Sequence, residues 1–340
     1  MSMFKLNKKI AITGAAGFIG SHLIRNLADL EFEISLGIDS FSPIYGGNWC
    51  NLRQKHLIPD VKVLKKDLLD LTAVELAKAL ADTDILIHLA AYPGVLAGET
   101  KKQEYLINNV VSSGKIIEAC RLNKNVKAIL FASSSSVYGD LALNGPCKEI
   151  DANGTQFKSH YAMTKWLNEI QFGSSQQELD IPVIGLRFFT VFGEWGRPDM
   201  AYGRFTESIL RNEPLKIYGG SDGARNMTHV DDATEIVIAL INKLYSNNFS
   251  AKKFDVFNIA SKNYVSTLSI VETLGKILGI EPKIEFVERP PGDAIITKAD
   301  TTKIEIETSK LKSRNLFDDL QNYTNWHKEF WLSGMQGKNA

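Results

Sequence analysis

Short apolar segments alternate with helical segments through the first half of this chain of 340 residues. The apolar segments are rich in branched residues, which is typical of strands, and helical patterns over 72–80, 104–121 and 161–178 lie between several of them. This alternation predicts an α/β fold, in which helices cover both faces of a doubly wound parallel sheet. The predicted strands cover residues 9–13, 33–38, 61–64, 85–89, 126–131 and 183–187.

The alternation breaks after Thr190, where turn-rich stretches at 193–198, 218–223 and 290–292 replace it. We expect residues 1–182 to form the sheet domain, with segments near 225–262 returning to it. Residues 183–340 should form mainly a smaller C-terminal α/β lobe that binds the substrate.

The charge balance and the cysteines exclude several classes of partner. Lysine plus arginine and aspartate plus glutamate both number 39, so no basic excess indicates nucleic acid or an anionic membrane as a partner. Cys50, Cys120 and Cys147 lack metal-ligand spacing, as do the scattered histidines, so we assign no metal and expect reduced thiols. The N-terminus matches a first strand and turn better than a secretion signal, and no apolar segment approaches the roughly 20 residues that span a bilayer. We therefore expect a cytoplasmic protein.

A glycine-rich turn directly follows the first predicted strand and opens a helix. Gly14, Gly17 and Gly20 allow the backbone to approach a pyrophosphate at the helix N-terminus, although such turns also serve plain packing. Asp39 closes the second strand, where a carboxylate accepts hydrogen bonds from ribose hydroxyls and repels a 2′-phosphate, favouring NAD over NADP. The alternative for Asp39 is a solvated loop residue. Asp67, after the third strand, is a further candidate at the adenine edge.

A serine run and a Tyr-x-x-x-Lys pattern predict proton chemistry. Ser133 to Ser136 end the fifth apolar run, and Tyr161 and Lys165 are four apart on a predicted helix, so they share one face. A nearby ammonium lowers the pKa of a phenol toward working pH. A hydroxyl at the strand end completes a general acid/base site for an alcohol or ketone, whereas the alternative for the serines is a polar strand end or cap.

Together these motifs resemble the extended short-chain dehydrogenase/reductase family, particularly its nucleotide-sugar epimerases. The segment WGRPDMA at 195–201 is similar to the signature of the UDP-glucuronate 4-epimerases. The other matching segments are GAAGFIG at 14–20, Asp39, HLAA at 88–91, SSSSVYG at 133–139, YAMTK at 161–165 and RFFTVFG at 187–193.

The resemblance implies a Rossmann-type sheet, NAD as cofactor and a role for each matching residue. Tyr161 is then the base at the sugar 4-hydroxyl, Lys165 binds the nicotinamide ribose, and Ser134 holds the family's usual hydroxyl position, with Ser135 and Ser136 as close substitutes. The implied cofactor contacts are Gly14, Gly17, Phe18, Ile19, Gly20, Asp39, Asp67, Leu68, Leu89, Ala90, Ala91, Asn109, Tyr161 and Lys165.

The substrate implied by the resemblance is a UDP-sugar. Arg197 is our candidate for a sugar carboxylate, because arginine binds a carboxylate through two bonds; its alternative is a loop ion pair with Asp199. Arg225 resembles the arginine that grips the diphosphate, and Arg289 is a second candidate for phosphate or ribose. Further substrate contacts are expected from Ser134, Ser135, Ser136, Tyr161, Thr190, Met200 and Tyr218.

The serine run also narrows the reaction. Related dehydratases carry an Asp-Glu pair beside the catalytic hydroxyl and related decarboxylases a glutamate, whereas this chain has Ser135 and Ser136. We therefore expect a UDP-sugar 4-epimerase that passes through a transient 4-keto sugar, with UDP-glucuronate and UDP-galacturonate as its substrates. The alternatives are another UDP-hexose 4-epimerase, a nucleotide-sugar 4-ketoreductase and, remotely, a non-catalytic NAD-binding scaffold.

Two further features bear on the substrate and the assembly. The glucuronate epimerases usually continue with Arg-x-Ser after Val95, but this chain has Leu96-Ala97-Gly98, so a polar substrate contact differs. The helices near 104–121 and 161–178 resemble those that form a four-helix dimer contact in relatives, so we expect a homodimer.

Overall fold

The computed structural model describes residues 8–42, 47–197, 199–246, 253–309 and 314–331. Its centre is a seven-stranded parallel sheet with the strand order β10-β6-β5-β4-β1-β2-β3. The order runs outward in both directions from β1 and β4, so the predicted doubly wound sheet is confirmed. The strands are β1 (Lys9–Thr13), β2 (Glu33–Asp39), β3 (Val63–Lys65), β4 (Ile85–His88), β5 (Ala128–Ser134), β6 (Val183–Phe188) and β10 (Phe254–Ile259).

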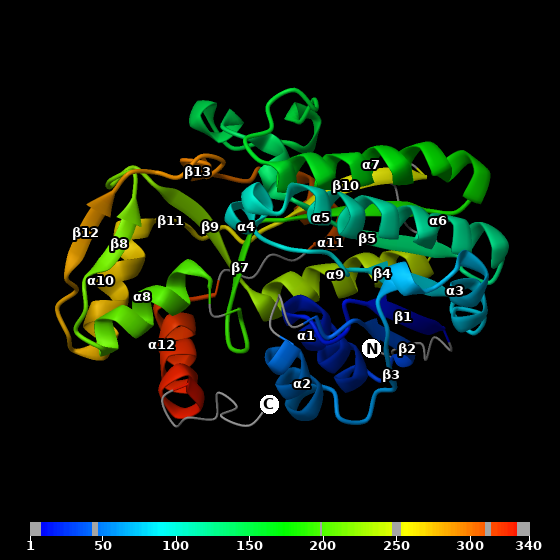
Figure 1. Cartoon of the computed structure of the whole chain (residues 1–340), viewed down its shortest axis with the longest axis horizontal. Coiled ribbons are helices and arrows are strands. Elements are labelled where there is room, and N and C mark those ends of the chain that lie inside the picture. The colour runs from blue at the N-terminus through cyan, green and yellow to red at the C-terminus, as the bar shows by residue number, and fades with distance from the viewer. Residues whose placement is uncertain (1–7, 43–46, 198, 247–252, 310–313, 332–340) are drawn as a thin grey trace.

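Helices cover both faces of this sheet (Figure 1). On one face α1 (Phe18–Asp29), α9 (Val230–Tyr245) and α11 (Thr302–Thr308) bury branched apolar side chains against the strands. On the other face lie α3 (Ala73–Ala79), α6 (Ser112–Leu122) and α7 (His160–Leu179). No helix within the described ranges is long and apolar enough to cross a membrane.

The helix predicted over 104–121 is built from three pieces. It consists of α5 (Lys102–Leu106), one π-helical turn (Ile107–Val111) and α6. A π turn adds a residue to the helix and commonly marks a functional site. Here it turns the fully buried side chain of Asn109 toward the loop that follows β4.

A smaller lobe lies beside the carboxyl ends of the strands (Figure 1). Its apolar core joins the two small sheets to three helices. The lobe's elements are β7 (Thr190–Phe192), α8 (Ala201–Leu210), β8 (Leu215–Tyr218), β9 (Ala224–His229), β11 (Tyr264–Ser266), α10 (Thr267–Leu278), β12 (Ile284–Val287), β13 (Ile296–Thr297) and α12 (Leu316–Trp326).

The chain passes several times between the central sheet and the smaller lobe, so a single boundary at residue 182 does not separate them. Strand β6 pairs with β5 in the central sheet, and β10 pairs with β6, so residues 183–188 and 254–259 are part of that sheet. Helix α9, which follows β9 of the lobe, packs on α1 beside the central sheet.

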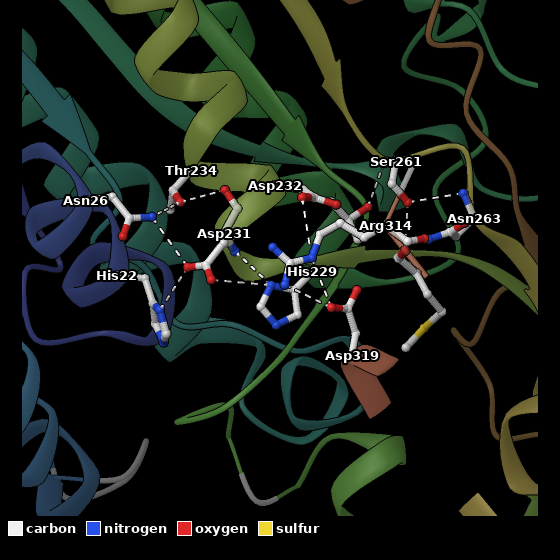
Figure 2. A network of polar contacts seen from close by, with 12 residues as sticks. His22, Asn26, His229, Asp231, Asp232, Thr234, Ser261, Asn263, Arg314 and Asp319 are labelled. Atoms are coloured by element: carbon white, nitrogen blue, oxygen red, sulfur yellow. Dashed lines mark hydrogen bonds and ion pairs between the residues drawn. The ribbon is translucent and has the colours of Figure 1, made fainter. Parts of the chain in front are cut away.

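A polar network fastens α1 to the start of α9 and to the chain before α12 (Figure 2). Asp231 accepts a hydrogen bond from Asn26, and its carboxylate lies 3.7 Å from His22 on one side and 3.7 Å from His229 on the other. The neighbouring Asp232 lies 3.8 Å from Arg314, which in turn donates to Asp319 at 2.9 Å. These contacts stabilise the junction between the lobe and the central sheet.

A buried ion pair joins α7 to the central sheet. Arg187 of β6 donates through Nε and Nη2 to the two carboxylate oxygens of Glu169 at 2.9 and 2.7 Å. Glu169 also accepts from Ser133 at 2.5 Å, while Arg187 donates to the Tyr138 hydroxyl at 2.9 Å. Arg187 is only 2% exposed and Glu169 5%, so neither charge is compensated by water.

We predict that Glu169→Gln lowers the free energy of unfolding by about 3 kcal/mol, because a buried arginine then loses its counter-ion. Urea denaturation followed by circular dichroism measures the change. Glu118→Gln is the matched control, since Glu118 forms an exposed pair with Arg121 and its loss should leave stability nearly unchanged. Equal unfolding midpoints for the two variants would contradict the prediction.

Candidate active site

A cavity of about 440 Å³ lies at the carboxyl ends of the central strands, where the strand order reverses between β1 and β4. Ligands of doubly wound sheets bind at this switch point. The predicted site residues that line the cavity are Gly14, Gly17, Phe18, Ile19, Gly20, Asp39, Asp67, Leu68, Leu89, Ala90, Ala91, Ser134, Ser135, Ser136, Tyr161, Lys165, Thr190, Arg197, Met200 and Arg225.

The glycine turn forms the floor at the start of α1. Gly14 has a φ of +70°, and a Cβ there would lie 2.8 Å from the Ala90 amide nitrogen. A Cβ on Gly20 would collide with the Gly14 carbonyl oxygen. No side chain caps the N-terminus of α1, so its first amides are available to an anionic group.

Two aspartates lie at the ends of β2 and β3. The Asp39 carboxylate accepts from the Ala16 amide at 3.0 Å and from the Phe41 amide at 2.8 Å, which fixes its orientation at the cavity wall. Burial raises the pKa of Asp39, and the hydrogen bonds from these two backbone amides oppose the rise. Asp67 accepts from the Leu69 amide at 2.9 Å and so caps the short helical turn that begins at Leu68.

The serine run divides its hydroxyls between two directions. Ser133 points to Glu169, so it serves the structural ion pair. Ser134 caps the 3₁₀ turn of residues Ser135–Tyr138, accepting from the Ser136 amide at 3.2 Å and from the Ser136 hydroxyl at 3.0 Å. Ser134 and Tyr161 both line the cavity, and the Ser134 hydroxyl acts to lower the pKa of the Tyr161 phenol.

Helix α7 presents Tyr161 and Lys165 on one face, as the spacing predicts. The Lys165 ammonium donates to the Ala132 carbonyl oxygen at 3.0 Å and lies 5.8 Å from the centre of the Tyr161 ring. Burial lowers the pKa of Lys165 to about 8.

The pKa of Tyr161 differs from the sequence-based expectation. Burial raises it, while the Ser134 hydroxyl and the charge of Arg197 lower it. The net direction is upward, because desolvation of the phenolate outweighs both stabilising effects.

Asn109 does not line the cavity but lies one layer behind it. Its side chain accepts from the Tyr92 amide at 2.7 Å and donates to the Tyr92 carbonyl at 3.1 Å. It also donates to Thr164 on α7 at 3.0 Å. These bonds hold the loop after β4 against the helix that carries Tyr161, so Asn109 shapes the cavity wall in this structure.

Arg197 lines the cavity beside Tyr161, and its side chain pairs with Asp199. Nε and Nη2 donate to the two carboxylate oxygens of Asp199 at 2.9 and 2.8 Å, which is the geometry with which arginine binds any carboxylate. The structure thus shows the loop ion pair with Asp199, while binding of a sugar carboxylate by Arg197 stays a prediction. Pro198, between the two, lies outside the described residues.

Tyr218 and Arg289 lie in a neighbouring cavity of about 200 Å³ that shares Thr190, Met200 and Arg225 with the first. Arg225 and Arg289 both donate to Asp293, at 3.1 and 3.0 Å. The guanidinium of Arg204, a residue that the sequence reading did not single out, lies 5.8 Å from the centre of the Tyr218 ring. The structure therefore groups an aromatic ring with three arginines next to the acid/base residues.

The sequence reading also missed Arg53, Lys158 and Ser159, which line the larger cavity. Arg53 belongs to α2 (Gly47–Leu57), which follows β2, and it is 2% exposed. An arginine in a short polar helix has no sequence pattern that separates it from an exposed one, so no signal in a single sequence identifies it. Ser159 was detectable as a cap, because it directly precedes α7 and accepts from the Ala162 amide.

Metal and thiol chemistry find no support in the described part of the chain. No group of three or more His, Cys, Asp or Glu side chains is placed there to hold a metal ion. Cys50, Cys120 and Cys147 are buried free thiols, and burial raises the pKa of Cys50 to about 11 and of Cys120 to about 12. The thiolate forms that react are therefore disfavoured.

Comparisons with known proteins agree with this geometry. Protein CapI of Staphylococcus aureus is 31% identical over 95% of this chain and 99% of its own length. UDP-glucuronate 4-epimerase 1 of Arabidopsis thaliana is 32% identical over 95% of this chain and 77% of its own length. The crystal structure of UDP-glucuronic acid 4-epimerase from Bacillus cereus, in complex with UDP-glucuronic acid and NAD, matches with a TM-score of 0.86 and 30% identity, over 95% of this chain and 99% of that one.

The family model described as the NAD dependent epimerase/dehydratase family matches residues 10–260, which include the glycine turn and both acid/base residues. The chain belongs to this family.

Proposed function

We propose that this protein is an NAD-dependent UDP-sugar 4-epimerase that interconverts UDP-glucuronate and UDP-galacturonate. The observation that carries the proposal is the arrangement of one cavity, which holds a dinucleotide-type glycine turn, the Ser134–Tyr161–Lys165 group and Arg197. The UDP-glucuronate 4-epimerases of Arabidopsis thaliana and Bacillus cereus, at 32 and 30% identity over 95% of this chain, support the same activity.

The residues present fit NAD. The uncapped N-terminus of α1 suits its diphosphate, and Gly14 and Gly20 let the turn pack closely against the loop after β4 and against itself. We propose that Asp39, buried at the end of β2, binds the adenosine ribose and that Lys165 binds the nicotinamide ribose, since both line the cavity. When bound, NAD supplies a hydride acceptor and donor at the sugar C4, and the chain's own residues handle the proton.

Tyr161 and Ser134 would exchange the proton of the sugar 4-hydroxyl. Both hydroxyls line the same cavity, so a proton could pass from the sugar oxygen to the phenolate and back without bulk water. Binding of a positively charged nicotinamide ring beside Tyr161 would lower the pKa of this phenol, which burial alone raises. The protonation state of Tyr161 is thereby linked to the charge of the cofactor.

The positions of the acidic residues that line the cavity do not favour an elimination or a decarboxylation. Among the described residues that line it, the carboxylates are Asp39, Asp67 and Asp293. The first two lie at the ends of β2 and β3, and Asp293 binds Arg225 and Arg289. The residues that follow Ser134 at the cavity wall are serines rather than acidic residues, so return of the hydride to the other face of the ketone is the outcome we propose.

Arg197 would hold the uronate carboxylate. A 4-keto uronate is a β-keto acid and loses CO₂ if electrons flow from its carboxylate, so a bidentate arginine on this group opposes the loss. Nη2 lies 3.3 Å from the position of a Cβ on Gly94, which shows how closely the arginine packs against the loop after β4. The paired arginines 225 and 289 in the adjoining cavity suit the UDP diphosphate, and Tyr218 is placed near them for the uracil.

A UDP-hexose 4-epimerase or a 4-ketoreductase remains the second candidate because of Leu96. This residue stands where the glucuronate epimerases usually have an arginine; it is 42% exposed and lines the smaller cavity. A neutral side chain there removes one cation from the neighbourhood of the nucleotide, so the substrate preference needs a direct test.

The helices that carry the site also expose an apolar surface that suits a second copy of the chain. It comprises Leu106, Ile107, Val111 and Ile170, on α5, the π turn and the packed helix α7. Each of these side chains is 39 to 52% exposed, which is costly for a surface left in water. We propose a homodimer that pairs these helices with their symmetry mates.

The first prediction concerns the reaction. Incubation with a panel of UDP-sugars should convert UDP-glucuronate to UDP-galacturonate without added NAD and without release of CO₂. Chromatography of the products measures this. Tyr161→Phe should abolish turnover while leaving the fold intact, because only one hydroxyl is removed. Stoichiometric accumulation of NADH, or a pentose product from the wild-type enzyme, would contradict the proposed function.

The second prediction concerns Arg197. Arg197→Ala should lower kcat/KM for UDP-glucuronate about 30-fold, the value expected for loss of one charge-assisted bonding group. Turnover of UDP-glucose, which has no carboxylate, should fall much less, because only the effect of the Arg197 charge on the Tyr161 phenol is lost, and some pentose should appear from UDP-glucuronate. Parallel steady-state assays measure both substrates. An equal loss for the two sugars would argue that Arg197 has only a structural role.

The third prediction concerns assembly. Light scattering after size-exclusion chromatography should give twice the mass of one chain for the wild type and one chain mass for Ile170→Asp. The matched control is Ile306→Asp on α11, since this exposed side chain lies on the opposite face of the sheet. A wild type with the mass of a single chain would refute the dimer.

A further inference from the structure

Arg53 is a buried cation at the wall of the larger cavity, and it has not been assigned a role above. Its side chain is 2% exposed, and Nε donates to the Trp195 carbonyl oxygen at 2.8 Å. Nη2 is buried without any hydrogen-bond acceptor. A guanidinium carries five donors, and a buried donor without an acceptor is costly. Arg53 therefore has an unsatisfied donor next to a space that a ligand can enter.

The position of Arg53 beside the glycine turn indicates which ligand that is. Cys50, one turn earlier on α2, packs against Ala16 of the glycine turn and against Phe41. Helix α2 thus lies alongside the start of α1, and both Arg53 and Gly17 line the cavity. The N-terminus of α1 and the side chain of Arg53 therefore line one cavity from two packed helices.

The charge of Arg53 is not matched by a nearby carboxylate. No ion pair of Arg53 is found among the described residues. Asp39 interacts electrostatically with Arg53, but its carboxylate already accepts hydrogen bonds from the Ala16 and Phe41 amides. Burial lowers the pKa of Arg53, which reflects the cost of an uncompensated buried charge. An anion bound in the cavity would offset this cost.

The other end of Arg53 reaches the turn that carries Arg197. The carbonyl of Glu194 contacts Nε2 of His22 on α1 at 3.0 Å, and the next carbonyl, of Trp195, accepts from Arg53. Trp195 has a φ of +62°, a left-handed conformation that a bulky residue adopts only when its surroundings hold it. Two successive carbonyls before Arg197 are thus fixed by residues of the cofactor-binding half.

We propose that Arg53 binds the diphosphate of the dinucleotide and positions, through Trp195, the turn that presents Arg197 to the substrate. The inference rests on the proposed function in that the dinucleotide is NAD. Arginine suits the task because its fork binds two oxygens of a phosphate group while its Nε remains bonded elsewhere. Binding of the cofactor would then fix Arg53, and Arg53 would in turn fix the turn that carries Arg197.

Calorimetric titration of nucleotide-free protein with NAD, ADP and adenosine tests the proposal. Arg53→Gln should lower the affinity for NAD and for ADP about 10- to 100-fold, the range for a lost charge-assisted bond. The affinity for adenosine, which has no phosphate, should not change. Arg53→Lys should recover most of the NAD affinity, because it restores the cation. Both variants should raise KM for UDP-glucuronate, since neither reproduces the bond from Nε to Trp195.

Arg25→Gln is the matched control. This substitution removes the same positive charge, but Arg25 lies on α1, where it pairs with Asp231 and does not line the cavity. It should bind all three nucleotides like the wild type. The proposal is overturned if Arg53→Gln binds NAD like the wild type, or if adenosine weakens as much as ADP, which would show a general distortion of the site. A wild-type protein that binds no NAD would instead refute the proposed function itself.

Discussion

Glu169 and Arg187 form a buried ion pair on which the geometry of the proposed catalytic residues depends. Tyr161, Lys165 and Glu169 follow one another at intervals of four along α7, so the carboxylate that anchors the helix lies on the same face as the acid/base groups. Its partner Arg187 belongs to β6, and Ser133, which also bonds the carboxylate, directly precedes Ser134 at the end of β5. A bidentate pair fixes both rotation and translation, and it therefore sets the distance between the phenol and the serine hydroxyl.

The strand order then places the cofactor-binding elements opposite this group. Because β1 and β4 lie side by side and the chain leaves them in opposite directions, the glycine turn after β1 faces the loop after β4 across one crevice. That loop is shaped from behind by Asn109, which also bonds Thr164 on α7. The lobe closes the crevice from the side, held by the polar network around Asp231 in Figure 2. Three independent sets of contacts thus converge on one cavity.

Local patterns in the sequence predict the fold and the centre of the site well. Strand and helix periodicity places β1 to β6 within a few residues, the spacing of Tyr161 and Lys165 fixes their common face, and the glycines mark the turn after β1. What the sequence does not reveal depends on contacts between distant segments. The π turn that moves Asn109 behind the wall, the burial that raises the pKa of Tyr161 and the contact of Arg53 with Trp195 all arise from tertiary packing. No single-sequence pattern encodes these, because each partner alone is compatible with an exposed residue.

The pair between Arg197 and Asp199 bears on how a uronate could be selected. For a sugar carboxylate to occupy the fork of Arg197, Asp199 must first release it, since its two oxygens already use Nε and Nη2. The side chain of Asp199 is 66% exposed, whereas that of Arg197 is 21% exposed, so a released aspartate is solvated at little cost. A substrate carboxylate bound at the cavity side of Arg197 is more fully removed from water, where the same bonds are stronger. A neutral hexose offers no such replacement and leaves the internal pair intact, so the exchange itself would discriminate between charged and uncharged sugars.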